Sequence, residues 1–217
     1  MLYATVNGER QRAQRGIAAS CPSCNAPMLA KCGEIVIWHW AHLSSKDCDE
    51  WASGETDWHL AWKGRFQKSQ VEVIVKRRDY RGEWSESFHR TDVLSARGHA
   101  IEFQHSSIST ENIRKRNDFY RTVIWVFDAR EPYDDDRLKF RDKKTHWTFK
   151  WNWPRKTIVA AWTPPWTIYL DTGADGLFEA RAIYDDRSYL TGWGFWRTPE
   201  WFVAEHSGTA ALQGSAR

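Results

Sequence analysis

The cysteines constrain this 217-residue chain most, because all four lie in its first quarter. They are Cys21, Cys24, Cys32 and Cys48. The sequence begins without the apolar stretch of a secretion signal, and no segment is apolar enough over a sufficient length to cross a membrane. We therefore expect a cytoplasmic protein without membrane contact, in which clustered thiols are reduced and bind metal rather than form disulfides.

The first two cysteines form a Cys-x-x-Cys knuckle, and a His-x-x-His motif follows it. Zinc accepts both sulfur and imidazole ligands, so Cys21, Cys24, His39 and His42 are a candidate tetrahedral zinc set. Two alternatives remain open. Cys32 or Cys48 can replace one histidine, or the thiols are simply buried without metal. A site closed by four protein ligands is structural, since it leaves no position for catalysis.

Composition places the rest of the chain among globular proteins. With 41% hydrophobic and 27% charged residues it is too apolar for a disordered chain, and its length fits one main domain with appendages. The expected parts are a zinc-binding segment (1–54), a core (55–130), a charged connector (131–144), a tryptophan-rich β lobe (145–205) and a flexible tail (206–217).

The core reads as a helix followed by strands, another helix and a strand. The expected elements are a helix over 55–68, a strand over 71–78, two strands within 89–106 that meet around Arg97 and Gly98, a helix capped by Ser109 or Thr110, and a buried strand over 122–129. This order predicts an α/β fold with a mixed sheet.

Two acidic residues interrupt the expected strands of the core. Glu102 and Gln104 are two residues apart and so face one side of their strand, where an antiparallel neighbour can bring Asp92 opposite them. Such an oxygen-rich site suits Mg²⁺ or Mn²⁺, which can activate a water for attack on a phosphodiester. The alternative is that these carboxylates lie on a solvated sheet face.

The helix expected over 55–68 carries a second group of ionisable side chains. Glu55, His59 and Lys63 recur every four residues, so they share one face of that helix. Without further context, a solvated stripe explains them as well as a functional site does.

Together these motifs resemble the competence protein CoiA-like family, which is assigned to the PD-(D/E)xK nuclease superfamily. The resemblance runs from about residue 21 to 128. The residues that carry it are Cys21-x-x-Cys24, His39-Trp-Ala-His42, Glu55-x3-His59-x3-Lys63, Arg90-Thr-Asp92, Ile101-Glu102-Phe-Gln104, Arg116-x3-Tyr120 and Val123-Ile-Trp-Val. It implies a restriction-endonuclease-like mixed-sheet core.

The resemblance also implies roles for the core residues. Asp92 and Glu102 form the Mg²⁺ or Mn²⁺ site, and Glu55 adds a carboxylate that binds the metal directly or through water. Gln104 takes the place of the superfamily's usual lysine, and a neutral amide can orient water but cannot lower its pKa by charge. Lys63 contacts phosphate, and His59 orients water or a carboxylate.

Two residues on the second helix complete the candidate site. Arg116 and Tyr120 are four residues apart on one helical face, where they can hold backbone phosphates of nucleic acid. The alternative is that Tyr120 packs in the core while Arg116 pairs with a carboxylate.

The function expected from these residues is that of a metal-dependent deoxyribonuclease, an endonuclease-type hydrolase acting on single- or double-stranded DNA. The alternative is a non-catalytic DNA-binding or recombination accessory protein that keeps the nuclease fold. A third possibility is an interaction module whose C-terminal lobe binds a protein partner. The 15 tryptophans favour unpaired bases if exposed, and provide core packing if buried.

Overall fold

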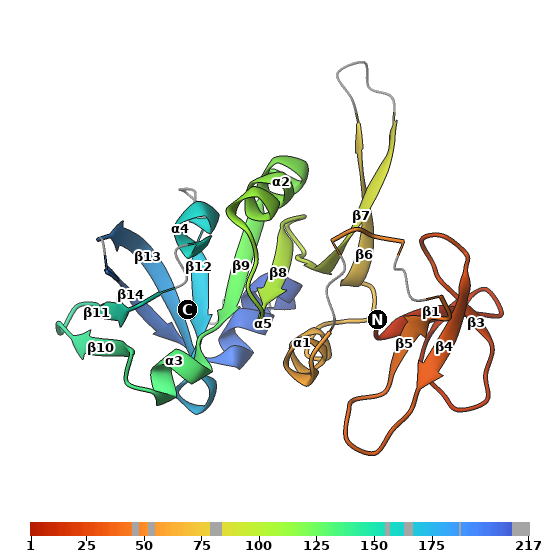
Figure 1. The fold of residues 1–217 in the computed structure, drawn as a ribbon, viewed down its shortest axis with the longest axis horizontal. Helices are drawn as coiled ribbons and strands as arrows, with labels where there is room; N and C mark the ends of the chain where they lie inside the picture. Colours follow the sequence, from red (N-terminus) through yellow and green to blue (C-terminus); the bar gives the residue numbers. More distant parts are fainter. Residues whose placement is uncertain are drawn as a thin grey trace, which may run out of the picture. The chain divides into compact units, whose positions relative to one another are not determined.

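The computed structural model describes residues 1–44, 48–51, 55–78, 84–154, 157–162, 167–186 and 188–209 (Figure 1). The chain divides into two compact units, Met1–Leu94 and Ser95–Arg217, and each is described by itself. The fold is mixed α/β. Among the described helices, none has the length and apolar character needed to span a membrane.

The first unit opens with a sheet of short strands. In spatial order they are β2 (Glu9–Arg12), β1 (Tyr3–Val6), β3 (Ala19–Ser20), β4 (Pro27–Lys31) and β5 (His39–His42), all antiparallel. Asn7 and Gly8 join β1 to β2, both with positive φ, as a tight hairpin turn requires. The core beneath this sheet contains Cys21 and Trp40, which are 1% exposed.

The remainder of the first unit is one helix and one long hairpin. Helix α1 (Asp57–Lys63) begins after its N-cap Thr56, and strands β6 (Val71–Arg78) and β7 (Trp84–Leu94) pair antiparallel. The strand expected over 71–78 is confirmed. The helix expected over 55–68 is shorter, because it ends at Lys63 and Gly64 is its C-cap.

The second unit is built on one mixed sheet. Its strands lie in the order β10-β11-β14-β13-β12-β9-β8. The bounds are β8 (Ala100–Gln104), β9 (Val123–Asp128), β10 (Leu138–Asp142), β11 (Trp147–Asn152), β12 (Ile168–Asp171), β13 (Leu177–Asp185) and β14 (Tyr189–Arg197). β8, β9 and β12 are parallel, and the remaining neighbours pair antiparallel.

Helices pack on both faces of the parallel part of this sheet (Figure 1). Helices α2 (Thr110–Tyr120) and α4 (Thr157–Ala161) cover the face that carries Trp125 and Ile168, since all of them contribute to one core cluster. Helix α5 (Pro199–Ser207) covers the opposite face, where the ring of Phe202 lies 4.7 Å from that of Tyr169. Ser109 caps α2 by accepting a hydrogen bond from the Asn112 amide, as expected.

The structure corrects two expectations for the C-terminal half. Residues 131–144 are not simply a connector, because they contain most of helix α3 (Arg130–Asp134) and all of strand β10, whose Leu138 is 1% exposed in the core. The tryptophan-rich segment is not a separate lobe either, because β12 pairs with β9 and so extends the sheet of the core. The predicted tail begins inside α5, and residues 210–217 lie outside the described part.

Candidate functional site

The Cys-x-x-Cys knuckle is a tight turn between β3 and β4. The Cys21 amide donates to the Ala26 carbonyl, and the Asn25 amide donates to the Cys21 carbonyl, both at 2.8 Å. Asn25 takes the positive φ of 61° that closes the turn. The amide of Ser23 thereby points at Cys21 Sγ, 3.4 Å away. The local backbone thus presents a thiol surrounded by hydrogen-bond donors, which favours its thiolate form.

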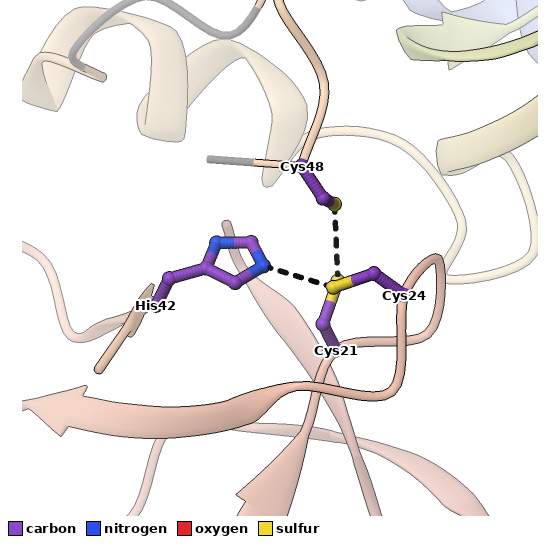
Figure 2. Close-up of side chains that lie close together, drawn as sticks. All are labelled: Cys21, Cys24, His42 and Cys48. Carbon is purple, nitrogen blue, oxygen red and sulfur yellow. Dashed lines mark hydrogen bonds between the residues drawn. The ribbon is translucent and has the colours of Figure 1, made fainter. Parts of the chain in front are cut away.

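Four potential metal ligands converge next to this turn (Figure 2). Cys21 and Cys24 come from the knuckle, His42 ends β5 opposite Met28, and Cys48 follows β5 along the chain. Their ligand atoms all lie within 4.8 Å of one another. Cys21 Sγ is 3.7 Å from Cys48 Sγ, and Cys24 Sγ is 3.4 Å from His42 Nε2. This Cys3His group can bind a metal ion.

The thiols of this group are electrostatically coupled. Burial raises the pKa of Cys21, but hydrogen bonds from the Cys24 and Ser23 amides and from neighbouring thiols outweigh it, so the pKa is lowered overall. Burial and the negative charge that develops on its neighbours raise the pKa of Cys48. Without a cation, then, these sulfurs resist ionising together. A bound metal ion relieves that conflict.

The structure brings Cys21, Cys24 and His42 together but leaves His39 out of the group. His39 Nδ1 lies 2.9 Å from the carbonyl oxygen of Ile37, at the other end of β5. His39 and His42 are three positions apart on β5, so their side chains face opposite sides of the strand and their Cα atoms are about 10 Å apart at a rise of about 3.3 Å per residue. Cys48, an alternative ligand in the sequence analysis, occupies the fourth position.

Asp49 links the Cys3His group to β7 within the first unit. Asp49 is 4% exposed, and its Oδ1 lies 2.9 Å from His89 Nδ1. Its Oδ2 accepts a hydrogen bond of 2.7 Å from the Arg90 amide. The indole of Trp51 stacks on the His89 ring with the centroids 3.2 Å apart. Burial opposes ionisation of Asp49, but these hydrogen bonds outweigh it and lower its pKa.

A second cluster in the first unit surrounds the buried ammonium group of Lys63. Lys63 is 1% exposed and forms ion pairs with Glu55, with Glu72 Oε1 at 2.9 Å and with Asp92 Oδ1 at 3.5 Å. Burial lowers the pKa of Lys63, but the three carboxylates outweigh it and raise the pKa overall. The same pairing lowers the pKa values of Glu55 and Glu72 against the effect of their burial.

This placement shows what surrounds Lys63. The side chain is 1% exposed and paired with carboxylates, and the phosphate contact predicted for it stays a prediction. Lys63 holds the carboxylate of Asp92, which is itself 21% exposed at its side chain. Lys63 thus connects Glu55, the residue before the N-cap of α1, to Asp92, the predicted metal ligand on β7.

Glu72 belongs to the same cluster, although its place in the sequence did not mark it as a candidate site residue. Its carboxylate accepts hydrogen bonds from the Leu2 amide at 2.7 Å and the Tyr3 amide at 3.1 Å, besides the pair with Lys63. Its φ of 51° is unusual for a residue other than glycine. The available signal was a charged residue inside a strand pattern, the same signal that drew attention to Asp92 and Glu102.

His59 has a structural role at the start of α1. It is 5% exposed, and its Nδ1 accepts a hydrogen bond of 3.3 Å from the Thr56 amide, in the manner of a capping box. Thr56 Oγ1 lies 2.9 Å from the same nitrogen. The imidazole therefore satisfies an amide at the helix terminus, and the role in orienting water or a carboxylate implied by the family resemblance stays a prediction.

In the second unit, Glu102 and Gln104 lie on the face of β8 that α2 covers. Arg116 Nη1 on α2 donates to Glu102 Oε2 at 2.6 Å, and both residues are buried. The Gln104 amide donates to the Ser106 carbonyl at 2.8 Å. Tyr120 packs against the core cluster. The positions of Arg116 and Tyr120 match the alternative, a carboxylate pair and core packing, and phosphate binding by these two residues stays a prediction.

The pairing predicted for Asp92 and Glu102 is not tested, because the two residues belong to different units. Each is described only within its own unit, where a basic side chain holds its carboxylate. The two cations are Lys63 for Asp92 and Arg116 for Glu102. The shared metal site therefore stays a prediction.

Comparison with known protein families connects both regions to one family. Residues 9–50, which contain the whole Cys3His group, match the N-terminal domain of competence protein CoiA. Residues 84–165, which contain Asp92, Glu102 and Gln104, match the nuclease-like domain of competence protein CoiA. No curated protein and no solved structure matches the chain. Because the two domains occur in their family order and span more than half of the sequence, the chain belongs to the competence protein CoiA-like family.

Proposed function

We propose that this protein is a metal-dependent nuclease that hydrolyses phosphodiester bonds in DNA. The observation that carries the proposal is the match of residues 84–165 to a nuclease-like domain, since that segment contains Asp92, Glu102 and Gln104. The proposed fold of this region is the restriction-endonuclease-like fold of the PD-(D/E)xK type. Oxygen ligands of this kind select Mg²⁺ or Mn²⁺, which supplies an activated water and stabilises charge on the phosphoryl group.

The residues of this chain fit the metal-binding role because basic side chains hold their carboxylates in place. The ammonium of Lys63 fixes Asp92, and a second ammonium, the N-terminus of Met1, lies 2.8 Å from Glu55 Oε2 and balances part of the remaining negative charge. The Asp92 side chain is 21% exposed, so a divalent cation can reach its carboxylate. In the other unit, Arg116 orients Glu102 through a hydrogen bond of 2.6 Å.

Gln104 restricts what the protein itself contributes to catalysis. Its amide nitrogen is engaged by Ser106, which leaves the amide oxygen facing the same side of β8 as Glu102. That oxygen can accept a hydrogen bond from a water and so orient it, but it carries no proton to transfer. Since Gln104 cannot activate the water by charge, we expect no cleavage without added Mg²⁺ or Mn²⁺.

The test is cleavage of labelled single- and double-stranded DNA with Mg²⁺ or Mn²⁺. Asp92→Asn and Glu102→Gln keep the size of each side chain and remove its charge, so each should lower the cleavage rate at least a hundredfold. Asp134→Asn, which removes an exposed carboxylate from α3, is the matched control and should cleave normally. A thermal melt of each variant separates loss of activity from loss of fold.

The alternative function is DNA binding as a recombination accessory protein. The absence of a lysine at position 104 favours it, because that position holds a neutral amide. DNA binding by the wild-type protein without cleavage under any metal condition would support this alternative and overturn the nuclease proposal.

We also propose that the Cys3His group binds structural Zn²⁺. In a tetrahedral zinc site the ligand atoms are separated by about 3.8 Å for two sulfurs and about 3.6 Å for sulfur and nitrogen, given zinc–ligand bonds of 2.3 and 2.0–2.1 Å. The corresponding distances are 3.7 Å between Cys21 and Cys48 and 3.4 Å between Cys24 and His42. With four protein ligands, such a site stabilises the fold and takes no part in catalysis.

A further inference from the structure

One face of the antiparallel part of the second sheet carries aromatic and basic side chains. On β14, Trp193 and Phe195 alternate with Gly192 and Gly194. The glycines lie on the side of the strand that faces the core, and the two aromatic residues lie on the other side. The register places Trp193 opposite Thr148 on β11, and Lys150 of the same strand projects to the same side. We call this surface the aromatic face and define it by Arg141, Lys150, Tyr189, Trp193, Phe195 and Arg197.

This face continues the one that α5 covers further along the sheet. Tyr169 on β12 pairs with Glu179 on β13, and Glu179 pairs with Phe195 on β14, so the three side chains lie on one side. At the β12 end, Phe202 of α5 packs on Tyr169. At the β14, β11 and β10 end, Lys150 and Arg141 are exposed, and Trp193 and Phe195 are half-buried.

The aromatic rings on this face are paired with cations. The Lys150 ammonium lies 4.4 Å from the ring centroid of Tyr189, and the guanidinium of Arg197 lies 5.5 Å from that of Phe195. The rings of Trp193 and Phe195 meet edge to face at 6.0 Å. These contacts hold the side chains in fixed positions before any ligand binds, which lowers the entropic cost of binding.

The basic side chains of the face outnumber its carboxylates, which are Glu179 and, at the edge, the exposed Asp186 hydrogen-bonded to Tyr189. Glu179 is its buried carboxylate, and its two oxygens are taken by Arg181 and Arg197 at 2.7 and 2.8 Å. Arg141 and Lys150 remain exposed on the neighbouring strands. Cations spaced along adjacent strands and interleaved with rings fit a ligand that alternates negative charges with flat apolar groups. Unpaired DNA has that chemistry, with phosphates for the cations and bases for the rings.

We propose that the aromatic face binds single-stranded DNA. Bases stack on Trp193 and Phe195, while Arg141 and Lys150 contact phosphates. Duplex DNA binds this face more weakly, because its bases are already stacked on one another and present only backbone. The inference deepens the proposed function by naming the strandedness of the substrate, and it is measured by binding alone.

The experiment measures the affinity of the full-length protein for fluorescein-labelled oligothymidylate by fluorescence anisotropy, without added Mg²⁺ or Mn²⁺. Trp193→Ala should weaken binding by on the order of tenfold or more, because stacking contributes about 1–3 kcal/mol per base. Lys150→Ala should weaken it less and reduce the salt dependence, with the slope of log K against log salt falling by about 0.7.

Two matched controls keep the test specific to this face. Lys115→Ala removes an exposed lysine from α2, on the opposite side of the sheet, and Trp153→Ala removes a tryptophan that is 76% exposed beyond the end of β11. Both variants should bind like the wild-type protein. The thermal melts of all four variants are compared, and Lys150→Ala keeps the test valid if Trp193→Ala unfolds.

The outcomes separate this inference from the nuclease proposal. Three results would overturn the proposal that the aromatic face binds single-stranded DNA. They are equal losses of affinity for Lys150→Ala and Lys115→Ala, an affinity unchanged by both Trp193→Ala and Lys150→Ala, and equal affinity of the wild-type protein for a blunt duplex. Selective loss at the face without metal-dependent cleavage of any DNA would leave the binding surface standing and overturn the nuclease. If cleavage depends on Asp92 while Trp193→Ala and Lys150→Ala change neither cleavage nor binding, the nuclease proposal stands and the proposal for the aromatic face is overturned.

Discussion

The carboxylate of Asp49 lies 2.9 Å from the imidazole of His89, which joins the residue after Cys48 to strand β7. The Arg90 amide donates to the other carboxylate oxygen at 2.7 Å. Asp92 follows two residues later on the same strand. The Cys3His group, through Cys48, and the position of Asp92 are therefore linked by the buried side chain of Asp49 and a short stretch of β7.

The first prediction concerns this link. Asp49→Ala should lower the free energy of unfolding by about 2–3 kcal/mol, because the Arg90 amide and the His89 ring lose a charged, buried partner. The measurement is urea denaturation followed by tryptophan fluorescence. Glu50→Ala removes the exposed neighbouring carboxylate and serves as the control. Identical unfolding midpoints for the two variants would contradict the prediction.

The second prediction concerns the ligands of the Cys3His group. The wild-type protein should contain one zinc ion per chain by elemental analysis, and Cys48→Ser and His42→Ala should lose it. Cys32→Ser and His39→Ala are the matched controls, since neither residue belongs to the group. Chelation of the metal should lower the melting temperature, because a structural site contributes its binding free energy to folding. Full zinc content in Cys48→Ser would show that another residue is the fourth ligand.

The third prediction concerns Lys63. Lys63→Met should lower the free energy of unfolding by about 3–5 kcal/mol, because it leaves the carboxylates of Glu55 and Glu72 without their buried cation. Lys68→Met, which removes an exposed lysine beyond α1, should have little effect. Both variants are compared by chemical denaturation at neutral pH.

A second substitution distinguishes lost charge balance from lost packing. Adding Glu72→Gln to Lys63→Met removes one of the carboxylates that the first change left unpaired. The double variant should therefore be more stable than the sum of the two single effects predicts. Strictly additive effects would mean that the ion pair does not explain the stability of this cluster.

The fourth prediction concerns the pH dependence of the second unit. Burial, and then the nearby charges of His99 and Arg97, lower the pKa of His206 from 6.5 to about 4. Between these values the unfolded chain binds a proton at this position and the folded chain does not. The free energy of unfolding should thus fall as pH decreases from 6.5 to 4, by up to about 3 kcal/mol.

The measurement is the melting temperature at intervals from pH 7 to pH 4. His206→Gln keeps a polar side chain without a proton to bind, so its stability should depend less on pH over this range. Parallel curves for the variant and the wild-type protein would rule out His206 as the source of the acid sensitivity.

Local patterns predicted the elements well where each signal was contained in a few neighbouring residues. Ser109 caps α2 as expected, and the alternation from Val71 to Arg78 forms β6. The pairing of strands distant in sequence was harder to predict. Where most residues of a strand are charged, the few apolar residues on its buried side do not form a recognisable alternating pattern. The segment from Leu138 to Asp142 was interpreted as part of a connector, although its Leu138 and Phe140 face the core.

The candidate site shows the same limit. The knuckle and His42 could be predicted from their spacing. The fourth ligand, His39 or Cys48, could not, because it depends on the path of the chain after β5. Glu72 could not be identified as a partner of Lys63, because their contact requires α1 to pack against β6. Burial of Lys63 and Arg116 also depends on tertiary packing, which the helical spacing alone does not reveal.

The two sides of β14 differ strongly in which substitutions they tolerate, because glycines occupy the side that faces the core. A methyl group at Gly192 would collide with the Ala182 carbonyl and the Phe149 ring, and one at Gly194 would collide with the Glu179 carbonyl. Thr191 and Trp193, on the other side, project away from those contacts. A combinatorial library confined to the outward positions could therefore retarget this strand to new ligands while the sheet beneath keeps its architecture.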